Sequence, residues 1–224
     1  MRNEDLKTEG IVLRRTNYSE ADRILNMITP VGKVAAIAKG VRKPKSKLAG
    51  GVEMFCLSEL VIHRGKGELG IVTSARMKKQ YGEIVKDLER MEMAAEMLKK
   101  IDKAAEGVGQ GEFFEILRQS LEGLNNGVDL KLVVSWFRLN FKRASGEEMN
   151  LYRDNIGEKL VANQRYDWRA AEEAFVVNET GEAGANEIKM LRLMATMDLA
   201  VVGRIKVNAE LIWRIYDIIK KWES

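Results

Sequence analysis

The first third of the chain alternates short apolar runs with charged or glycine-rich breaks, which predicts β-strands over residues 10–15, 23–29, 33–38, 52–63 and 68–74. In the fourth run, residues of one parity are apolar, as a half-buried strand requires, with Ser58 interrupting Val52, Met54, Cys56, Leu60 and Ile62. Five short strands in roughly 70 residues favour a small sandwich or barrel. The five-stranded Greek-key barrel called the OB-fold is the leading candidate.

The rest of the chain changes to a helical period. Apolar residues recur three or four positions apart from Ile84 to Ile101, and again over 113–124, 130–141, 188–199 and 211–222. Asp129 stands where the N-cap of the third of these helices is expected. Residues 146–186 are polar and lack a clear period outside 168–177. We therefore predict an α+β protein in two domains, an OB barrel over residues 1–80 and an all-α helical domain over 81–224 with an irregular insert at about 146–186.

Charge is distributed unevenly along the 224 residues. Residues 1–80 hold 16 Lys and Arg against 8 Asp and Glu, whereas residues 81–224 hold 21 against 25. The net charge of +4 hides this asymmetry, and the basic character belongs to the N-terminal third, which is the candidate anion-binding module. The chain has no apolar run long enough for a membrane span and no signal-peptide core at its start, so a cytoplasmic protein is expected. The single Cys56 excludes an intramolecular disulfide and fits a reducing compartment.

The densest positive charge lies between the third and fourth predicted strands, over residues 39–48. No acidic residue occurs between Asp22 and Glu53. Strand connections run over the surface, so these charges are available to a partner. A polyanion is the natural partner, because each cation that neutralises a phosphate releases a counterion. A loop that only increases solubility is the competing interpretation.

Residues with catalytic potential are sparse. His63 is the only histidine and ends a strand, where an outward-facing structural role is expected. Cys56 has the parity of core residues, and free cysteines are commonly buried. The segment 65–67 is too short for a phosphate-binding loop and precedes a strand instead of a helix. An enzyme is therefore not expected.

The remaining residues of interest indicate that the protein binds a partner. Arg14 and Arg15 are adjacent in a strand and should point to opposite faces. Tyr18 is either a stacking platform for a base or a turn residue that packs locally. The candidate nucleic-acid contacts are Arg14, Arg15, Arg23, Lys33, Lys39, Arg42, Lys43, Lys45, Lys47, Arg64 and Lys66. With few aromatic residues in the barrel, we expect contacts mainly to the phosphate backbone, with strong salt dependence.

Four segments in this region resemble the RecO family of bacterial recombination mediators in order and spacing. They are Gly-Ile-Val-Leu-Arg at 10–14, Tyr-Ser-Glu-Ala-Asp-Arg at 18–23, Thr-Pro-Val-Gly-Lys at 29–33, and Ala-Lys-Gly-Val-Arg-Lys-Pro-Lys-Ser-Lys-Leu at 38–48. In the helical part, Trp-Phe-Arg-Leu at 136–139 resembles the family's third bundle helix. The resemblance in sequence covers residues 9–80 well. In the helical remainder, mainly the layout of the helices is similar.

The resemblance implies binding of single- and double-stranded DNA, annealing of complementary strands, and a role in DNA repair and recombination after DNA damage. The implied partners are RecR, the acidic C-terminal tail of the single-stranded-DNA-binding protein, and indirectly RecA, which would be loaded onto single strands. It also implies a bacterial, nucleoid-associated location. Basic positions of the third helix, Lys131, Arg138 and Lys142, are candidates for partner binding.

The chain departs from the family pattern in two places. Many members carry a four-cysteine zinc module after the third bundle helix, but here that place is held by residues 150–157 without cysteine. A thiolate zinc site is thus impossible, no cofactor is expected, and the segment should be held by packing of Leu151, Ile156, Leu160, Trp168 and Phe175. The chain also ends at Ser224, so the family's basic tail is short or missing.

Two other functions fit the same residues. An RNA-binding OB module would share the basic barrel and prefer RNA through the 2′-hydroxyl. A protein-interaction scaffold would use the helical domain and show no salt-dependent affinity for nucleic acid.

Overall fold

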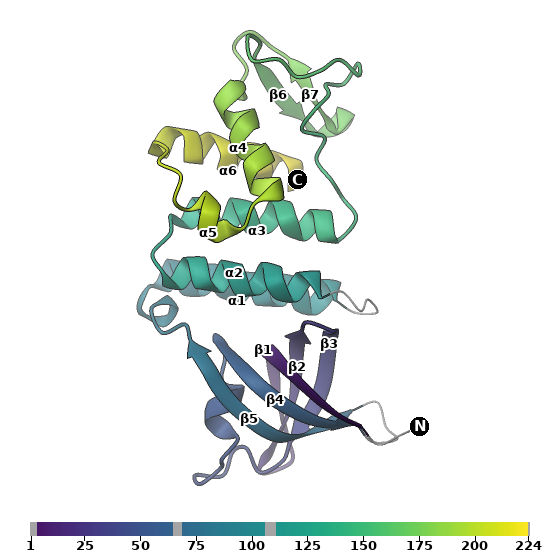
Figure 1. Cartoon of the computed structure of the whole chain (residues 1–224), viewed down its shortest axis with the longest axis vertical. Coiled ribbons are helices and arrows are strands. Elements are labelled where there is room, and N and C mark those ends of the chain that lie inside the picture. Colours follow the sequence, from purple (N-terminus) through teal and green to yellow (C-terminus); the bar gives the residue numbers. More distant parts are fainter. Residues whose placement is uncertain (1–3, 65–68, 106–110, 224) are drawn as a thin grey trace. The chain divides into compact units, whose positions relative to one another are not determined.

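The computed structural model describes residues 4–64, 69–105 and 111–223. The chain forms two compact units, residues 1–125 (unit 1) and 126–224 (unit 2) (Figure 1). Unit 1 contains the barrel, and unit 2 is largely helical.

Unit 1 begins with a closed five-stranded barrel of β1 (Glu4–Tyr18), β2 (Asp22–Thr29), β3 (Gly32–Ala38), β4 (Cys56–Arg64) and β5 (Gly70–Gln80). The strands follow one another around the barrel in the order β1-β2-β3-β5-β4, and β4 pairs with β1 to close it. Only the β3–β5 pair is parallel among these pairings. The predicted five-stranded OB-like barrel is confirmed.

Alternating side chains fill the barrel. Leu25 and Met27 of β2 face Val34 and Ala36 of β3 in its core, as the period of two requires. β1 departs from this alternation, because its register shifts between Val12 and Arg14 and leaves three consecutive buried residues from Ile11. Such a bulge bends the strand, which suits a long strand that pairs with two neighbours around a barrel.

The fourth strand begins later than the sequence pattern predicts. Residues 49–52 form a short 3-10 helix, η1 (Ala49–Val52), and β4 starts at Cys56. Phe55 has a positive φ of 55°, which is incompatible with an extended strand. A Cβ on Gly51 would lie 2.4 Å from the carbonyl carbon of Ala75, so only glycine fits there. Val52 and Met54 nevertheless contact the barrel core. Their apolar character reflects this burial and not a strand.

Two helices follow the barrel within unit 1. They are α1 (Leu88–Ala104), capped by the Asp87 side chain on the Arg90 amide at 3.1 Å, and α2 (Glu112–Asn125), with the short η2 (Ile84–Lys86) before them. They lie at the end of the barrel where β2 turns into β3 (Figure 1). A Cβ on Gly111 would lie 2.1 Å from the Pro30 carbonyl oxygen, so glycine permits this close backbone approach. The compact unit thus extends past the predicted domain boundary at residue 80, which is where β5 ends.

Unit 2 is built on α3 (Leu130–Ala144), α4 (Ala185–Thr196), α5 (Leu199–Val202) and α6 (Ala209–Glu223). The predicted N-cap is present, because the Asp129 carboxylate accepts from the Leu132 amide at 3.1 Å. The predicted fourth helix is wrong at its end. It stops at Thr196, Met197 is extended, and Leu199 opens the separate α5.

The insert at 146–186 adds a small two-stranded sheet, β6 (Tyr166–Arg169) and β7 (Ala174–Val177), joined by η3 (Ala170–Glu172). Trp168 and Phe175 are buried and meet edge to face, with ring centroids 5.2 Å apart. Leu151 and Leu160 are also buried, as predicted. Ile156 is 75% exposed, so its predicted packing role is wrong. The C-terminal region is accordingly largely helical and not all-α.

The described part of the chain holds no helix that is long and apolar enough to cross a membrane. The same described residues contain no cluster of three His, Cys, Asp or Glu side chains arranged to bind a metal ion.

Candidate nucleic-acid interface

The basic loop, defined as residues 39–48, is anchored to the barrel through its backbone. Val41 is 3% exposed and belongs to the barrel core. Gly40 has φ of 64°, and its amide donates to the Asp22 carboxylate at 2.7 Å. The Arg42 amide donates to the Ala21 carbonyl at 2.9 Å, in the turn between β1 and β2. The loop therefore holds a defined shape although most of its side chains face solvent.

The charges of this loop point outward. Arg42, Lys43, Lys45 and Lys47 are exposed, as is Lys39. Among the described residues, no carboxylate lies within ion-pair distance of any of these five cations. The Arg42 guanidinium donates to the Ser19 carbonyl at 3.3 Å. These cations are solvated, and their charge is available to an external anion.

The register of the barrel places two other predicted cations near this loop. Ile37 of β3 pairs with Ile71 of β5, and Ile71 pairs with His63 of β4. Two strand spacings of roughly 4.8 Å therefore separate the end of β3 from the end of β4. Arg64, which is exposed, follows His63 at the end of β4, so its backbone lies about two strand spacings from the last residues of β3. Arg23 pairs with Ala38, the last residue of β3, so it lies beside the start of the basic loop.

The predicted cations Arg14 and Lys33 occupy a different place. Both bind Asp102 of α1, with Arg14 Nε 2.9 Å from Oδ2 and Lys33 Nζ 2.8 Å from Oδ1. The side chain of Lys33 is 13% exposed and that of Asp102 is 15% exposed. The structure thus brings these two cations to the helices and not to the rim. Their contact with DNA stays a prediction, because their charge is engaged within unit 1.

Arg15 also has an internal partner. It binds Glu53, whereas Arg14 binds Asp102 in α1, so the two arginines do point to opposite sides of β1. Sequence reasoning missed Asp102 and Glu53 as partners. The first acidic residue after the basic stretch is Glu53, which was a usable signal, but nothing in the spacing of Asp102 indicates its contact with β1 and β3.

The remaining predicted positions fall into two groups. Lys66 lies outside the described residues. In unit 2, Lys131 is exposed, whereas Arg138 binds Glu223 at 3.0 Å and stacks over Tyr216. Lys142 binds Glu147 at 2.8 Å and lies over Trp222. Two of these three cations therefore stabilise unit 2 itself.

The two candidate catalytic side chains have structural surroundings. Cys56 is buried, and burial raises the pKa of its thiol, so the nucleophilic thiolate is disfavoured. His63 Nδ1 lies 2.8 Å from the Asp5 carboxylate on the surface. In the described part of the chain, no hydroxyl or thiol makes a hydrogen bond with His63, so a nucleophile–histidine pair is not formed there.

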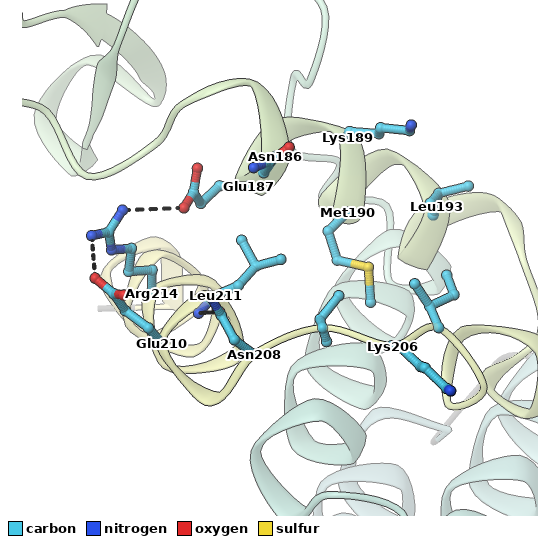
Figure 2. A pocket seen from close by; sticks show the side chains of 12 residues that line it. Asn186, Glu187, Lys189, Met190, Leu193, Lys206, Asn208, Glu210, Leu211 and Arg214 are labelled. Atoms are coloured by element: carbon cyan, nitrogen blue, oxygen red, sulfur yellow. Dashed lines mark hydrogen bonds and ion pairs between the residues drawn. The ribbon is translucent and has the colours of Figure 1, made fainter.

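Unit 2 contains a cavity of about 410 Å³ between α4 and the start of α6 (Figure 2). Its floor is apolar, from Met190, Leu193 and Leu211. Glu187 lies at one side, where its carboxylate accepts from the Gly184 amide at 2.9 Å and pairs with Arg214 at 3.4 Å. These polar groups fix the ends of the two helices, so they serve the fold of unit 2.

These features define an OB-barrel protein with an appended helical unit and a basic loop at one rim of the barrel. Comparison with known proteins makes this specific. Residues 1–81 match the family model described as "Recombination protein O N terminal", and residues 85–223 match "Recombination protein O C terminal". The chain therefore belongs to the RecO family of DNA repair proteins.

Individual relatives extend over most of the chain. It is 31% identical to the DNA repair protein RecO of Dehalococcoides mccartyi over 218 residues, which cover 93% of this chain and 85% of the relative. It is 29% identical to that of Heliobacterium modesticaldum over 96% of this chain and 82% of the relative. With that of Alkaliphilus metalliredigens it shares 25% identity over 97% and 92% of the two chains.

Proposed function

We propose that this protein binds single- and double-stranded DNA through the basic loop and the adjoining rim, anneals complementary strands, and assists the loading of RecA in recombinational repair. The relatives' name, DNA repair protein RecO, supports a role in DNA repair. The observation that carries the proposal is the anchored loop, whose five cations are exposed and lack carboxylate partners among the described residues.

The mechanism needs no bond-making chemistry. Two DNA strands repel each other through their phosphates, and cations on a fixed loop reduce that repulsion by replacing condensed counterions. Because Val41 and Asp22 hold the loop backbone in place, the protein loses little conformational entropy when it binds. Complementary bases can then meet while the backbones stay neutralised.

Strand annealing by a loop variant tests this proposal. Replacing Arg42, Lys43, Lys45 and Lys47 together by glutamine should slow annealing roughly 10- to 100-fold at low salt, because up to four phosphate contacts are lost. The matched control replaces four exposed cations elsewhere, Lys99, Lys103, Arg204 and Lys220, by glutamine and should anneal nearly as the parent does. Equal annealing by the loop variant and the parent would contradict the proposal.

Competition with RNA separates the proposal from an RNA-binding module. DNA and RNA of one sequence should compete about equally or in favour of DNA, because a backbone-directed loop does not read the 2′-hydroxyl. A strong preference for RNA would support the RNA-binding module. No salt-dependent binding to either would support the interaction scaffold.

The partners that family membership suggests are RecR, the acidic tail of the single-stranded-DNA-binding protein, and RecA through the loaded strand. Of the three cations considered in unit 2, Lys131 is the one with an exposed side chain. Arg138 and Lys142 hold α3 to α6 and the insert through Glu223 and Glu147. We therefore assign a partner contact in this region to Lys131 first.

A further inference from the structure

A second cavity of unit 2, with a volume of about 640 Å³, is lined by the insert and by the C-terminal ends of α3 and α6. Trp168 of β6 and Trp222 of α6 contribute aromatic side chains to its lining. The charged residues of the lining are four carboxylates and one ammonium group, from Glu147, Glu148, Glu173, Glu223 and Lys142. Carboxylates beside aromatic rings favour a cationic ligand.

Two of the four carboxylates have cationic partners within unit 2. Glu147 pairs with Lys142 at 2.8 Å, and Glu223 pairs with Arg138 at 3.0 Å. The Lys142 ammonium also lies over the Trp222 ring, 5.1 Å from its centre. The charge of Lys142 is therefore compensated, and its position shows that a cation fits against this ring.

The other two carboxylates are available to a ligand. Glu148 and Glu173 are exposed, and within the residues that the structure describes neither carboxylate binds a cation. Glu173 has a left-handed backbone, with φ of 49° and ψ of 35°. Glycine or asparagine is the usual residue in this conformation, so the local backbone does not account for a glutamate there.

Trp168 provides an independent sign of a missing partner. This side chain lines the cavity and is only 5% exposed. Its indole N–H is buried and has no hydrogen-bond acceptor among the described residues. Buried polar groups are nearly always paired, because leaving one without a partner is costly. The cavity therefore calls for a hydrogen-bond acceptor as well as a cation.

We propose that this cavity binds a basic peptide segment of a partner protein. Cationic side chains of the peptide pair with Glu148 and Glu173, and a peptide carbonyl accepts from the Trp168 indole N–H. A polyamine supplies the cations but no carbonyl, and the carboxylates repel an acidic peptide. The site uses no residue of the basic loop, so this inference does not rest on DNA binding.

Calorimetric titration with capped tetralysine tests the site, beside spermine, which matches its charge but lacks a carbonyl. The parent protein should bind tetralysine at least about fivefold more tightly than spermine at low salt, because one more hydrogen bond forms. Glu148→Gln with Glu173→Gln should weaken tetralysine binding roughly 10-fold through the loss of two charge-assisted contacts. Trp168→Phe, which keeps an aromatic ring, should weaken it about fivefold and leave spermine binding unchanged. Thermal unfolding confirms that each variant folds.

The matched control is Glu158→Gln with Glu179→Gln, two exposed carboxylates of unit 2 outside the cavity lining, which should leave both affinities unchanged. No tetralysine binding by the parent, or equal binding by the Glu148–Glu173 variant, would overturn the site. Spermine binding as tight as that of tetralysine, with no effect of Trp168→Phe, would overturn the assignment of a peptide. Self-association in sedimentation that the Glu148–Glu173 variant abolishes would replace the partner protein by the basic loop of a second copy.

Discussion

Two groups of barrel cations that the sequence presents as one differ in their surroundings. Those of the basic loop at the rim have exposed side chains and, within the described residues, no carboxylate partner. Arg14 and Lys33, at the side toward α1, share Asp102 and are tied to the fold. The loop cations are thus available to an external anion, whereas Arg14 and Lys33 stabilise the contact of the barrel with α1. The position of a carboxylate 69 or 88 residues away decides between these uses.

Removing the shared carboxylate should have the largest effect on stability. The side chain of Lys33 is mostly buried, and Asp102→Asn removes the carboxylate charge beside it. This loss should lower the free energy of unfolding by about 2 to 3 kcal/mol. Denaturant unfolding measures this. The control Glu59→Gln, which removes a more exposed pair with Arg76, should change stability by less than ~1 kcal/mol. Similar small effects of both variants would show that Asp102 does not hold the helices to the barrel.

Loosening the anchor of the loop should have a smaller effect. Val41→Ala opens a cavity in the barrel core and should cost about 1 to 2 kcal/mol. It should also weaken DNA binding several-fold without changing the number of cations, because the loop must then be ordered on binding. Val31→Ala, at an exposed position in the β2–β3 turn, is the matched control. If Val41→Ala lowers stability but leaves affinity unchanged, a fixed loop shape is not needed for binding.

Much of the fold could be predicted from the sequence, because local patterns carry it. The alternation in β2 and β3 and the cap at Asp129 report directly on burial and hydrogen bonding. The start of β4 was missed, because Val52 and Met54 are buried without being in a strand. The exposed Ile156 was missed for the converse reason, since an apolar residue in a turn need not pack.

The candidate site could be predicted only in part. The charge density of residues 39–48 marks the loop, and the family pattern points to the same residues. The contact of Lys33 with Asp102 and the position of Arg23 beside the basic loop depend on the docking of α1 and on strand register. These are long-range features, so no local period in the sequence reveals them.

The most direct test of the division between the two groups of cations is the salt dependence of single-stranded DNA binding. The loop variant in which Arg42, Lys43, Lys45 and Lys47 are glutamine should reduce the slope of log affinity against log salt by roughly 2 to 3. The variant Arg14→Gln with Lys33→Gln, measured once shown to be folded, should reduce it by less than about 0.5. A reduction of about 1.4 for that pair, the full value for two phosphate contacts, or none for the loop variant, would contradict the account.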